Sequence, residues 1–519
     1  INHRHTMTTL TNDEISKKND REVMRTADDA VIAKLSASSL GYYDDPFLPY
    51  LCTKSSGLVA TPKFEQNNIS PSPSSSSSSS SSSRPFSSSF PSSRNSHRLR
   101  GLNHGRNHNF SHSKPQASNF QQHPIIRRGT HARVCVMDRS ISSFLRILNS
   151  DKSPPCKESN NPVGQIVVLG GGKDTSCLRA WRNMLLRTEN EATNSTSCNQ
   201  ITWYEIDHSL LIEEKAKLIA SCPLLSHNTQ VHRINIGNGM NQKNANKLST
   251  NASASQFMVQ MINETPTDKE IDLSTSNTNH RLHLVGHDLR ETDQLFNIIQ
   301  CLHNFNADIP TLFIMECVLM YLPGKRIFIF VSNIFLIFSI QTDYSKSFFM
   351  LPILVMLSER EGRNLLQSIT TNCKQSLLGL YDPILSNDAF GKVMEQNLTR
   401  AGVADAQSSM RNTRTLESQL DKLINCGFSH AVGCDMATAY DTVVDIQQRI
   451  RANQIEMLDE VEEWILIMKH YCFIVASTNA SNSMSSSQCK PKSRSIQSFS
   501  SSQPGNFLGF DPKRCTTRP

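Results

Sequence analysis

Between residues 165 and 325 the chain alternates short apolar runs with segments whose apolar positions recur at helical spacing. Each run is rich in β-forming residues and is followed by, or ends in, a glycine or an acidic residue. This alternation is typical of a parallel α/β sheet, in which ligand-binding groups follow the carboxyl ends of the strands. The strands are predicted at 165–169, 201–206, 283–286 and 311–315.

Further elements are predicted on both sides, so that one large α/β domain extends over 124–477, with an N-terminal helical part at 21–51. Two stretches rich in Asn, Ser and Thr, 188–200 and 239–279, are expected to be surface loops. Helical spacing is found at 137–148, 364–376, 390–398, 416–426 and 458–469, and short β-rich runs at 377–381 and 471–476.

The remaining segments are polar and repetitive, and we expect them to be disordered: 1–20, a Ser/Arg-rich insertion at 53–122, and a tail at 478–519. The insertion holds ten consecutive serines at 74–83 and cannot bury enough apolar surface to offset the entropy of ordering. With 38% hydrophobic and 7% aromatic residues in 519, the whole composition agrees with one large core plus unfolded segments.

Charge and cysteine content change this picture little. The formal net charge is +7, and arginines accumulate from Gln66 to Met137 without any Asp or Glu. Such a tract can bind nucleic acid or anionic lipid. We favour a solvated linker, with no nucleic-acid and no membrane partner. The 14 cysteines are spaced neither as a zinc site nor as a secreted disulfide framework, so we expect reduced thiols and a cytoplasmic protein. No signal peptide is recognisable, and the start is expected at Met7 or upstream of Ile1.

One segment interrupts the α/β pattern. Residues 327–340 form an apolar run of 14, and a second run of 10 at 348–357 is broken by Pro352. A membrane helix needs about 20 apolar residues, so neither run is well suited to span a bilayer. We interpret 327–356 as an insertion, of the kind that a translated intron would produce.

The first candidate for ligand binding is a glycine-rich turn after the first predicted strand. Gly170, Gly171 and Gly172 let the backbone approach a ligand, and 174–176 are of the types that begin a helix. The motif is neither a P-loop nor GxGxxG, which disfavours a pyrophosphate and allows a nucleoside. A simple tight turn is the alternative.

Acidic residues follow the other predicted strands. Asp207 ends the second, where a carboxylate can accept hydrogen bonds from ribose hydroxyls or only cap a helix. Asp288 and the amide of Leu289 follow the third and can read an adenine edge. Glu316 ends the fourth, where it can pair with a ligand ammonium, because buried carboxylates need a partner. No metal site is expected.

Two residues complete the set. Arg133 is suited to a bidentate grip on a carboxylate, although a surface arginine of the basic tract is the alternative. Tyr321 lies close to Glu316 and can line a site or pack in the core. Ribose, adenine, an ammonium and a carboxylate occur together in S-adenosylmethionine, so we expect this cofactor.

These motifs resemble those of the leucine carboxyl methyltransferase family. The resemblance covers 22–51, 124–325 and 358–477. It implies a class I S-adenosylmethionine-dependent methyltransferase, which is an α/β fold with a Rossmann-like, mostly parallel sheet and helices on both faces. The shared blocks are Asp28-Asp-Ala with Lys34 and Gly41-Tyr-Tyr-Asp-Asp-Pro46, 128–133, 169–175, 204–207, 288–290, 310–321, 381–383, 390–398, 416–419 and 470–472.

The family methylates the C-terminal leucine of the protein phosphatase 2A catalytic subunit, and the resemblance implies the same activity here. We expect a monomer. The substrate carboxylate, with an unperturbed pKa near ~3.5, is itself the nucleophile, so no catalytic dyad is expected. The implied cofactor contacts are Arg133 for the methionine carboxylate, Gly170 in the glycine turn, Asp207 for ribose, Asp288 and Leu289 for adenine, and Glu316 for the ammonium. Lys34 and Tyr321 match positions near the substrate end.

Three alternatives stay open. The first is a methyltransferase of the same fold that acts on a small-molecule acid or a tRNA base. The second is a non-catalytic phosphatase-binding protein whose site is broken by the 327–356 insertion. The third is a protein anchored to a membrane through that segment.

Overall fold

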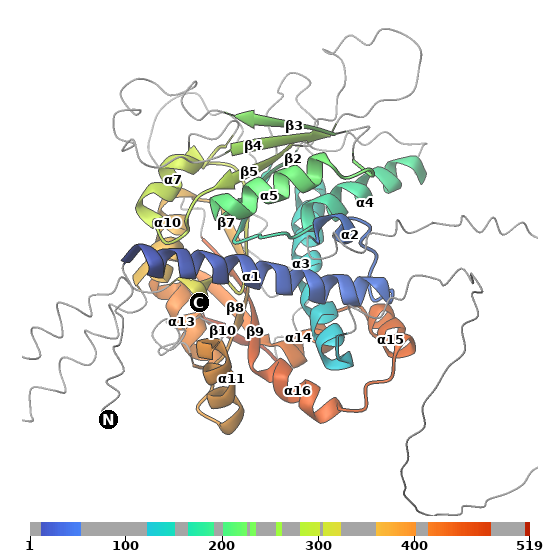
Figure 1. Ribbon diagram of the computed structural model, residues 1–519. Coiled ribbons are helices and arrows are strands. Elements are labelled where there is room, and N and C mark those ends of the chain that lie inside the picture. Colours follow the sequence, from blue (N-terminus) through green and yellow to red (C-terminus); the bar gives the residue numbers. More distant parts are fainter. Residues whose placement is uncertain are drawn as a thin grey trace, which may run out of the picture. The chain divides into compact units, whose positions relative to one another are not determined.

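A ten-stranded sheet runs through the part of the chain that the computed structural model describes (Figure 1). The strand order is β10-β8-β9-β7-β6-β1-β2-β5-β4-β3. The strands are β1 Gly164–Leu169, β2 Ile201–Asp207, β3 Thr229–Ile234, β4 Gln256–Met261, β5 Arg281–Gly286, β6 Thr311–Glu316, β7 Ser376–Pro383, β8 His430–Asp435, β9 Tyr471–Ser477 and β10 Thr516–Arg518.

All described residues belong to one of two compact units of the chain, Ile1–Ser56 with Phe120–Pro519. Apart from Gln122, the predicted disordered insertion at 53–122 lies outside the described residues, and so does the whole 327–356 segment. The described residues are 12–52, 122–150, 164–190, 201–225, 229–234, 256–261, 281–300, 305–322, 360–400, 414–478 and 514–518.

The five central strands, β5-β2-β1-β6-β7, are parallel. From β1 the chain continues to β2 on one side and later to β6 on the other, so β1 and β6 border the switch point at which open α/β sheets bind ligands. Antiparallel strands extend both edges, with β4 beside β5 and β9 between β7 and β8. The predicted Rossmann-like α/β fold is confirmed at the centre of the sheet.

Helices cover both faces of this sheet. Along β1 the side chains alternate, with Ile166 and Val168 in one hydrophobic core and Val167 and Leu169 in the other. Because both faces are buried, the strands appear in the sequence as continuous apolar runs. The first core is covered by α3 Pro124–Ser150, α4 Ser176–Asn190, α5 Ser209–Ala220, α14 Met436–Thr442 and α16 Val461–Lys469, and the second by α7 Thr292–Gln300, α10 Arg360–Asn372 and α13 Leu416–Asn425.

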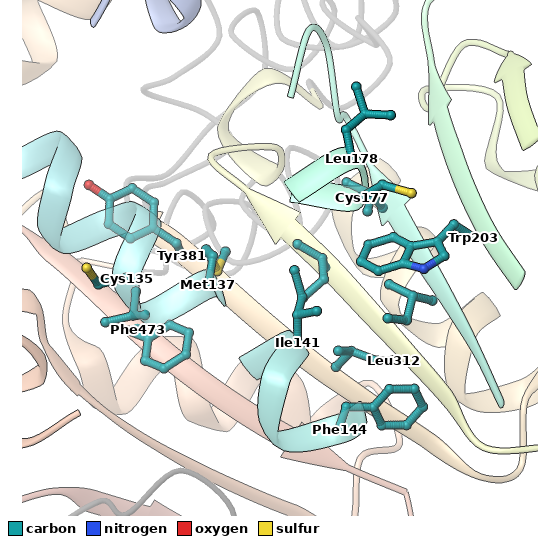
Figure 2. Close-up of a cluster of buried hydrophobic side chains, with 14 of the residues drawn as sticks. Cys135, Met137, Ile141, Phe144, Cys177, Leu178, Trp203, Leu312, Tyr381 and Phe473 are labelled. Carbon is teal, nitrogen blue, oxygen red and sulfur yellow. The ribbon is translucent and has the colours of Figure 1, made fainter. Parts of the chain in front are cut away.

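Figure 2 shows part of the first core, in which α3 packs on the strands. Ile141 and Phe144 of this helix lie near Leu312 of β6. The N-terminal helices α1 Asn12–Ser39 and α2 Leu48–Leu51 contact each other and pack on α3 and α5, respectively. No helix among the described residues is both long and apolar enough to cross a membrane.

The structure departs from the predicted elements at several places. Helix α1 includes 12–20, and α3 begins at Pro124 rather than near Met137. Strand β4 lies inside the predicted loop 239–279, because a short, half-polar strand beside long polar stretches gives no clear pattern. Residues 514–518 of the predicted tail contain β10, which has three residues and depends on pairing with β8. The remaining elements are α11 Ala389–Arg400, α15 Ile446–Ile455 and the 3₁₀ helix η4 Leu319–Tyr321.

Candidate functional site

The predicted site residues meet at the carboxyl ends of the central strands. Leu169 of β1 pairs with Ile206 of β2 and Met315 of β6, so the next residues along each strand form one row. That row consists of Gly170, Asp207 and Glu316. Gly286 of β5 pairs with Asp207, and Asp288 follows two residues later. Two cations reach the row from outside the sheet: Lys34 from α1 and Arg133 from α3.

The glycine turn is bonded directly to the end of β2. Gly170 has φ +70° and donates its N–H to the carbonyl of Ile206 at 2.8 Å. A Cβ atom on Gly170 would lie 2.6 Å from a methyl group of Val318. Gly172, with φ +51°, donates its N–H to the Asp207 carboxylate at 2.6 Å. The turn therefore needs glycine for conformation as well as for space, and it holds Asp207 in place.

Asp207 is buried and is held by two backbone donors. One oxygen accepts the Gly172 N–H, and the other accepts the His208 N–H at 2.6 Å. Burial raises the pKa of Asp207, although both hydrogen bonds oppose that shift. The alternative interpretation as a helix cap is wrong, because α5 begins at Ser209 with His208 as its N-cap. Each carboxylate oxygen keeps a second lone pair, so a pair of neighbouring hydroxyls could still be bound.

Asp288 and Leu289 present an acceptor next to a donor. Asp288 accepts hydrogen bonds from the Arg290 guanidinium, at 2.8 Å from Nε to each carboxylate oxygen. Burial acts to raise the pKa of Asp288, but Arg290 outweighs it and the pKa is lowered. In the described part of the chain, the Leu289 N–H has no backbone acceptor. An ionised acceptor and a backbone donor on adjacent residues fit the edge of a base.

Four charged side chains form a cluster between the glycine turn and β6. Lys34 Nζ lies 2.8 Å from Asp174 Oδ1 and 3.2 Å from Glu316 Oε2, and Arg133 Nε donates to Glu316 Oε1. Burial opposes ionisation of Glu316, but Arg133 and Lys34 outweigh it and lower its pKa. Burial likewise acts to lower the pKa of Lys34, but Asp174 and Glu316 raise it. Burial is also outweighed at the other two groups, where Lys34 lowers the pKa of Asp174 and Glu316 raises the pKa of Arg133. All four groups are therefore charged at neutral pH.

Arg133 keeps part of its binding capacity. Its Nε atom is bonded to Glu316, whereas its two terminal nitrogens have no acceptor among the described residues. The guanidinium carbon lies 5.2 Å from the centre of the Tyr381 ring, and the side chain is 24% exposed. The interpretation as a surface arginine of a basic tract therefore does not hold. A carboxylate could bind to the two terminal nitrogens as a pair.

Tyr321 lies at the end of η4, among apolar side chains. Its hydroxyl is hydrogen-bonded to Thr26 of α1, and burial raises its pKa to about 12. It packs against a small apolar cluster of Met320 and Leu385, which Met394 and Leu398 also contact. Both sequence interpretations fit this position, since the ring packs in a small core close to Glu316.

Lys34 has partners that the sequence did not predict, and one of them, Asp174, was given no ligand-binding role. The resemblance assigned Lys34 to the substrate end, and its ammonium lies between the carboxylates of Asp174 and Glu316. Asp174 was assigned only to the helix start. It does accept the Ser176 N–H at 3.1 Å, but its other oxygen binds Lys34. An acid in a glycine-rich turn was the only available signal for this second role.

A serine, a histidine and an aspartate also meet outside this row. Ser386 Oγ lies 2.8 Å from His470 Nε2, and Asp388 lies 3.1 Å from the same nitrogen. In a catalytic triad the acid would hold the other ring nitrogen, which here contacts the Leu466 carbonyl. Asp388 also accepts the Gly391 N–H in the first turn of α11, so we interpret the cluster as structural.

Metal and disulfide chemistry have no basis in the described residues. They contain no group of His, Cys, Asp and Glu that could hold a metal ion. Ten cysteines lie in this part of the chain, and none of them forms a disulfide.

Comparison with known proteins shows the family to which the chain belongs. The family described as leucine carboxyl methyltransferase matches residues 22–334, which is more than half of the chain. The chain belongs to the leucine carboxyl methyltransferase family. As a member, it is an S-adenosylmethionine-dependent carboxyl methyltransferase. The family match includes every residue of the predicted site, from Lys34 to Tyr321.

Relatives of this family member come from fungi, animals and plants. Leucine carboxyl methyltransferase 1 of Yarrowia lipolytica is 25% identical over 354 residues, 68% of this chain and 79% of the relative. The leucine carboxyl methyltransferase 1 homolog of Arabidopsis thaliana is 26% identical over 357 residues, 69% and 78%. Among solved structures, loganic acid methyltransferase with SAH matches at 8% identity and a TM-score of 0.29, covering 67% of this chain and 96% of that one. So low a TM-score adds nothing to the fold argument.

Proposed function

We propose that this methyltransferase esterifies the α-carboxylate of a C-terminal leucine, and that its substrate is the catalytic subunit of protein phosphatase 2A. The observation that carries the proposal is the charge cluster at the switch point, beside the glycine turn. The names of the relatives support leucine as the acceptor residue. The phosphatase as partner is supported by the family resemblance of the sequence blocks.

The cluster has the charges that the methionine end of the cofactor needs. An amino acid head group carries one ammonium and one carboxylate. Glu316 can accept from the ammonium, and Arg133 can bind the carboxylate with the two nitrogens that it does not use for Glu316. The Arg133–Glu316 ion pair is therefore complementary to a zwitterion placed next to it. We assign both residues to the methionine end.

The nucleoside end is supported by the row along β1, β2 and β5. Asp207 has acceptor capacity left for the two ribose hydroxyls, and the glycine turn at Gly170 allows close backbone approach. Asp288 and the Leu289 N–H fit the amino group and a ring nitrogen of adenine. The donors and acceptors present thus fit S-adenosylmethionine without a phosphate site.

Lys34 is best assigned to the cofactor side as well. Its ammonium holds Asp174 and Glu316 in their ionised forms, as the lowered pKa of each carboxyl indicates. Lys34 divides its charge between Asp174 and Glu316, so Glu316 can share its oxygens with a ligand ammonium in addition to Lys34 and Arg133. We propose that Lys34 orients Glu316, and that Tyr321 and the apolar side chains around it contact the substrate leucine.

The reaction needs little from the protein beyond placement. The cofactor supplies a methyl group already activated on a sulfonium. The substrate carboxylate is ionised at neutral pH, so no general base is required. Holding carboxylate oxygen, methyl carbon and sulfur in line can supply about 7–11 kcal/mol. We propose that the protein acts in the cytoplasm and that it is a monomer.

A methyl-transfer assay tests the proposal. The full-length protein is incubated with radiolabelled S-adenosylmethionine and the phosphatase catalytic subunit, or with peptides that end in leucine. We expect a base-labile methyl ester on the free acid, and none on a peptide with a C-terminal amide or alanine. Label on RNA or on a small acid would replace this function with another of the same fold. Phosphatase binding without transfer would favour the non-catalytic alternative, and a variant lacking 327–356 tests whether that segment blocks the site.

A further inference from the structure

The sequence block 381–383 was singled out by resemblance, but no role was given to Tyr381. This residue lies on β7, where it pairs with Glu316 across the β6–β7 ladder. Its backbone carbonyl accepts the Cys317 N–H at 2.7 Å. Cys317 has φ +57°, and it is the only described residue other than glycine with a positive φ. Tyr381 thus holds the unusual turn that follows Glu316.

The ring of Tyr381 lies beside Arg133, which together with Glu316 forms the proposed methionine end. The Arg133 guanidinium carbon is 5.2 Å from the ring centre, within the range of a cation–π interaction. Tyr471 of β9 stacks on Tyr381 at 5.2 Å, with an angle of 11° between the rings. Tyr381 is only 5% exposed, so the ring has little freedom to move. It forms a rigid surface for a long and otherwise flexible cation.

This ring contact differs in kind from the contact with Glu316. Among the described residues, Arg133 has one hydrogen-bond acceptor, Glu316. A ligand ammonium at Glu316 would compete for that acceptor, and the guanidinium would lose part of its restraint. The contact with Tyr381 uses the ring face and no hydrogen bond, so it remains when the carboxylate is shared. The ring can therefore keep Arg133 oriented in the liganded state.

We propose that Tyr381 is a positioning residue, which acts through Arg133 and, by its carbonyl, through the turn after Glu316. This inference rests on the proposed role of Arg133 at the methionine carboxylate. It assigns the side-chain effect to the ring rather than to the hydroxyl.

Three variants separate the ring from the hydroxyl and from core packing. Tyr381→Phe keeps the ring, and Tyr381→Leu removes it. Phe473→Leu is the matched control, because Phe473 pairs with Tyr381 across the β7–β9 ladder and belongs to the same core (Figure 2). We expect Tyr381→Leu to raise the Kd and the KM for S-adenosylmethionine about 10-fold. The KM for a leucine-ended peptide should change less than about 2-fold, and Tyr381→Phe should resemble the wild type.

A double-mutant cycle with Arg133→Ala shows whether Tyr381 acts through Arg133. In the Arg133→Ala background, Tyr381→Leu should weaken cofactor binding by less than about 2-fold. The Phe473→Leu variant should lose as much thermal stability as Tyr381→Leu while keeping its cofactor affinity within about 2-fold. Equal losses of affinity in Tyr381→Leu and Phe473→Leu, or additive effects in the cycle, would overturn the inference. If Arg133→Ala itself binds the cofactor normally, the proposed role of Arg133 fails, which is a separate result.

Discussion

The nucleoside end and the methionine end of the proposed cofactor site are built in different ways. At the nucleoside end, the contacts of the acids come from the same loop or from the end of the neighbouring strand: Asp288 is bonded to Arg290, and Asp207 to His208 and to Gly172, 35 positions away. At the methionine end, the contacts of Glu316 span 282 positions to Lys34 and 183 to Arg133. One end is formed by the strand termini and the loops after them, whereas the other exists only when α1 and α3 pack on the sheet.

This difference has a consequence for stability. The charges of Lys34 and Arg133 connect α1 and α3 to the glycine turn and to β6, so they contribute to the fold as well as to the site. Removing one partner of a buried ion pair leaves the other charge without compensation. The ion pair between Asp288 and Arg290 joins residues two positions apart in one loop. We therefore expect substitutions at the methionine end to change affinity and stability together, and the Asp288 substitution to change affinity alone.

The largest effect is expected for Arg133→Ala. The variant loses the charged donor proposed for the methionine carboxylate and leaves Glu316 with Lys34 as its only cation among the described residues. Hydrogen bonds between charged groups contribute about 1.5–3 kcal/mol, so the Kd for S-adenosylmethionine should rise by about 10- to 100-fold. The melting temperature should fall in the same variant. Calorimetric titration and thermal unfolding measure the two quantities.

Arg133→Lys is the control for this experiment. It keeps the positive charge but lacks the planar pair of donors, so it should restore most of the stability and little of the affinity. Near-normal cofactor affinity in Arg133→Ala would contradict the assignment. Loss of affinity at unchanged stability would instead remove the distinction between the two ends.

The same contrast explains which parts of the site could be predicted from the sequence. Gly170, Asp207, Asp288 and Glu316 each end a recognisable apolar run or follow it within two residues, and the parallel sheet brings such positions together. The partners of Lys34 could not be predicted, because no local pattern connects a residue of α1 with Asp174 and Glu316. The ring contact of Tyr381 depends on the same tertiary packing.

The fold shows a similar division. The central strands were recognised because they are buried on both faces and therefore continuously apolar. Strand β10 has three residues, of which Thr517 is exposed, and it exists by pairing with β8, 81 or more positions earlier. Such a strand has no local signal, since its stability comes from its partner.

A smaller effect, confined to affinity, is expected for Asp288→Ala. The variant removes the acceptor proposed for the adenine amino group, so the Kd for S-adenosylmethionine should rise about 10-fold. Its ion pair with Arg290 is 30% exposed on both sides, and such pairs contribute at most about 1 kcal/mol. The melting temperature should therefore stay close to that of the wild type. Arg290→Ala, which leaves the acceptor in place, is the matched control. A large loss of stability in Asp288→Ala would contradict the expected difference between the nucleoside end and the methionine end.

The smallest effect is expected in the pH dependence of stability, which should change in opposite directions in Lys34→Met and Asp207→Asn. Burial opposes ionisation of Asp174 and Glu316, but Lys34 at Asp174, and Arg133 and Lys34 at Glu316, hold the pKa of each carboxyl below its usual value of 3.8 or 4.5. Their contribution to stability is present above those values and is lost as the pH falls through the lower pKa of the folded state. The stability deficit of Lys34→Met should accordingly be largest near pH 7 and shrink below about pH 4.

Asp207→Asn should follow the opposite course. Burial raises the pKa of Asp207 above 3.8, so the unfolded chain releases this proton at lower pH than the folded protein does. Wild-type stability then decreases relative to that of a side chain that does not ionise, as the pH rises from about 4 through the raised pKa. The stability of Asp207→Asn, measured relative to wild type, should therefore increase as the pH rises from about 4 to 7.5. Melting temperatures of both variants and the wild type, measured between pH 4 and 7.5, test this opposition. Parallel pH profiles would mean that the two ends do not differ in how their carboxylates are held.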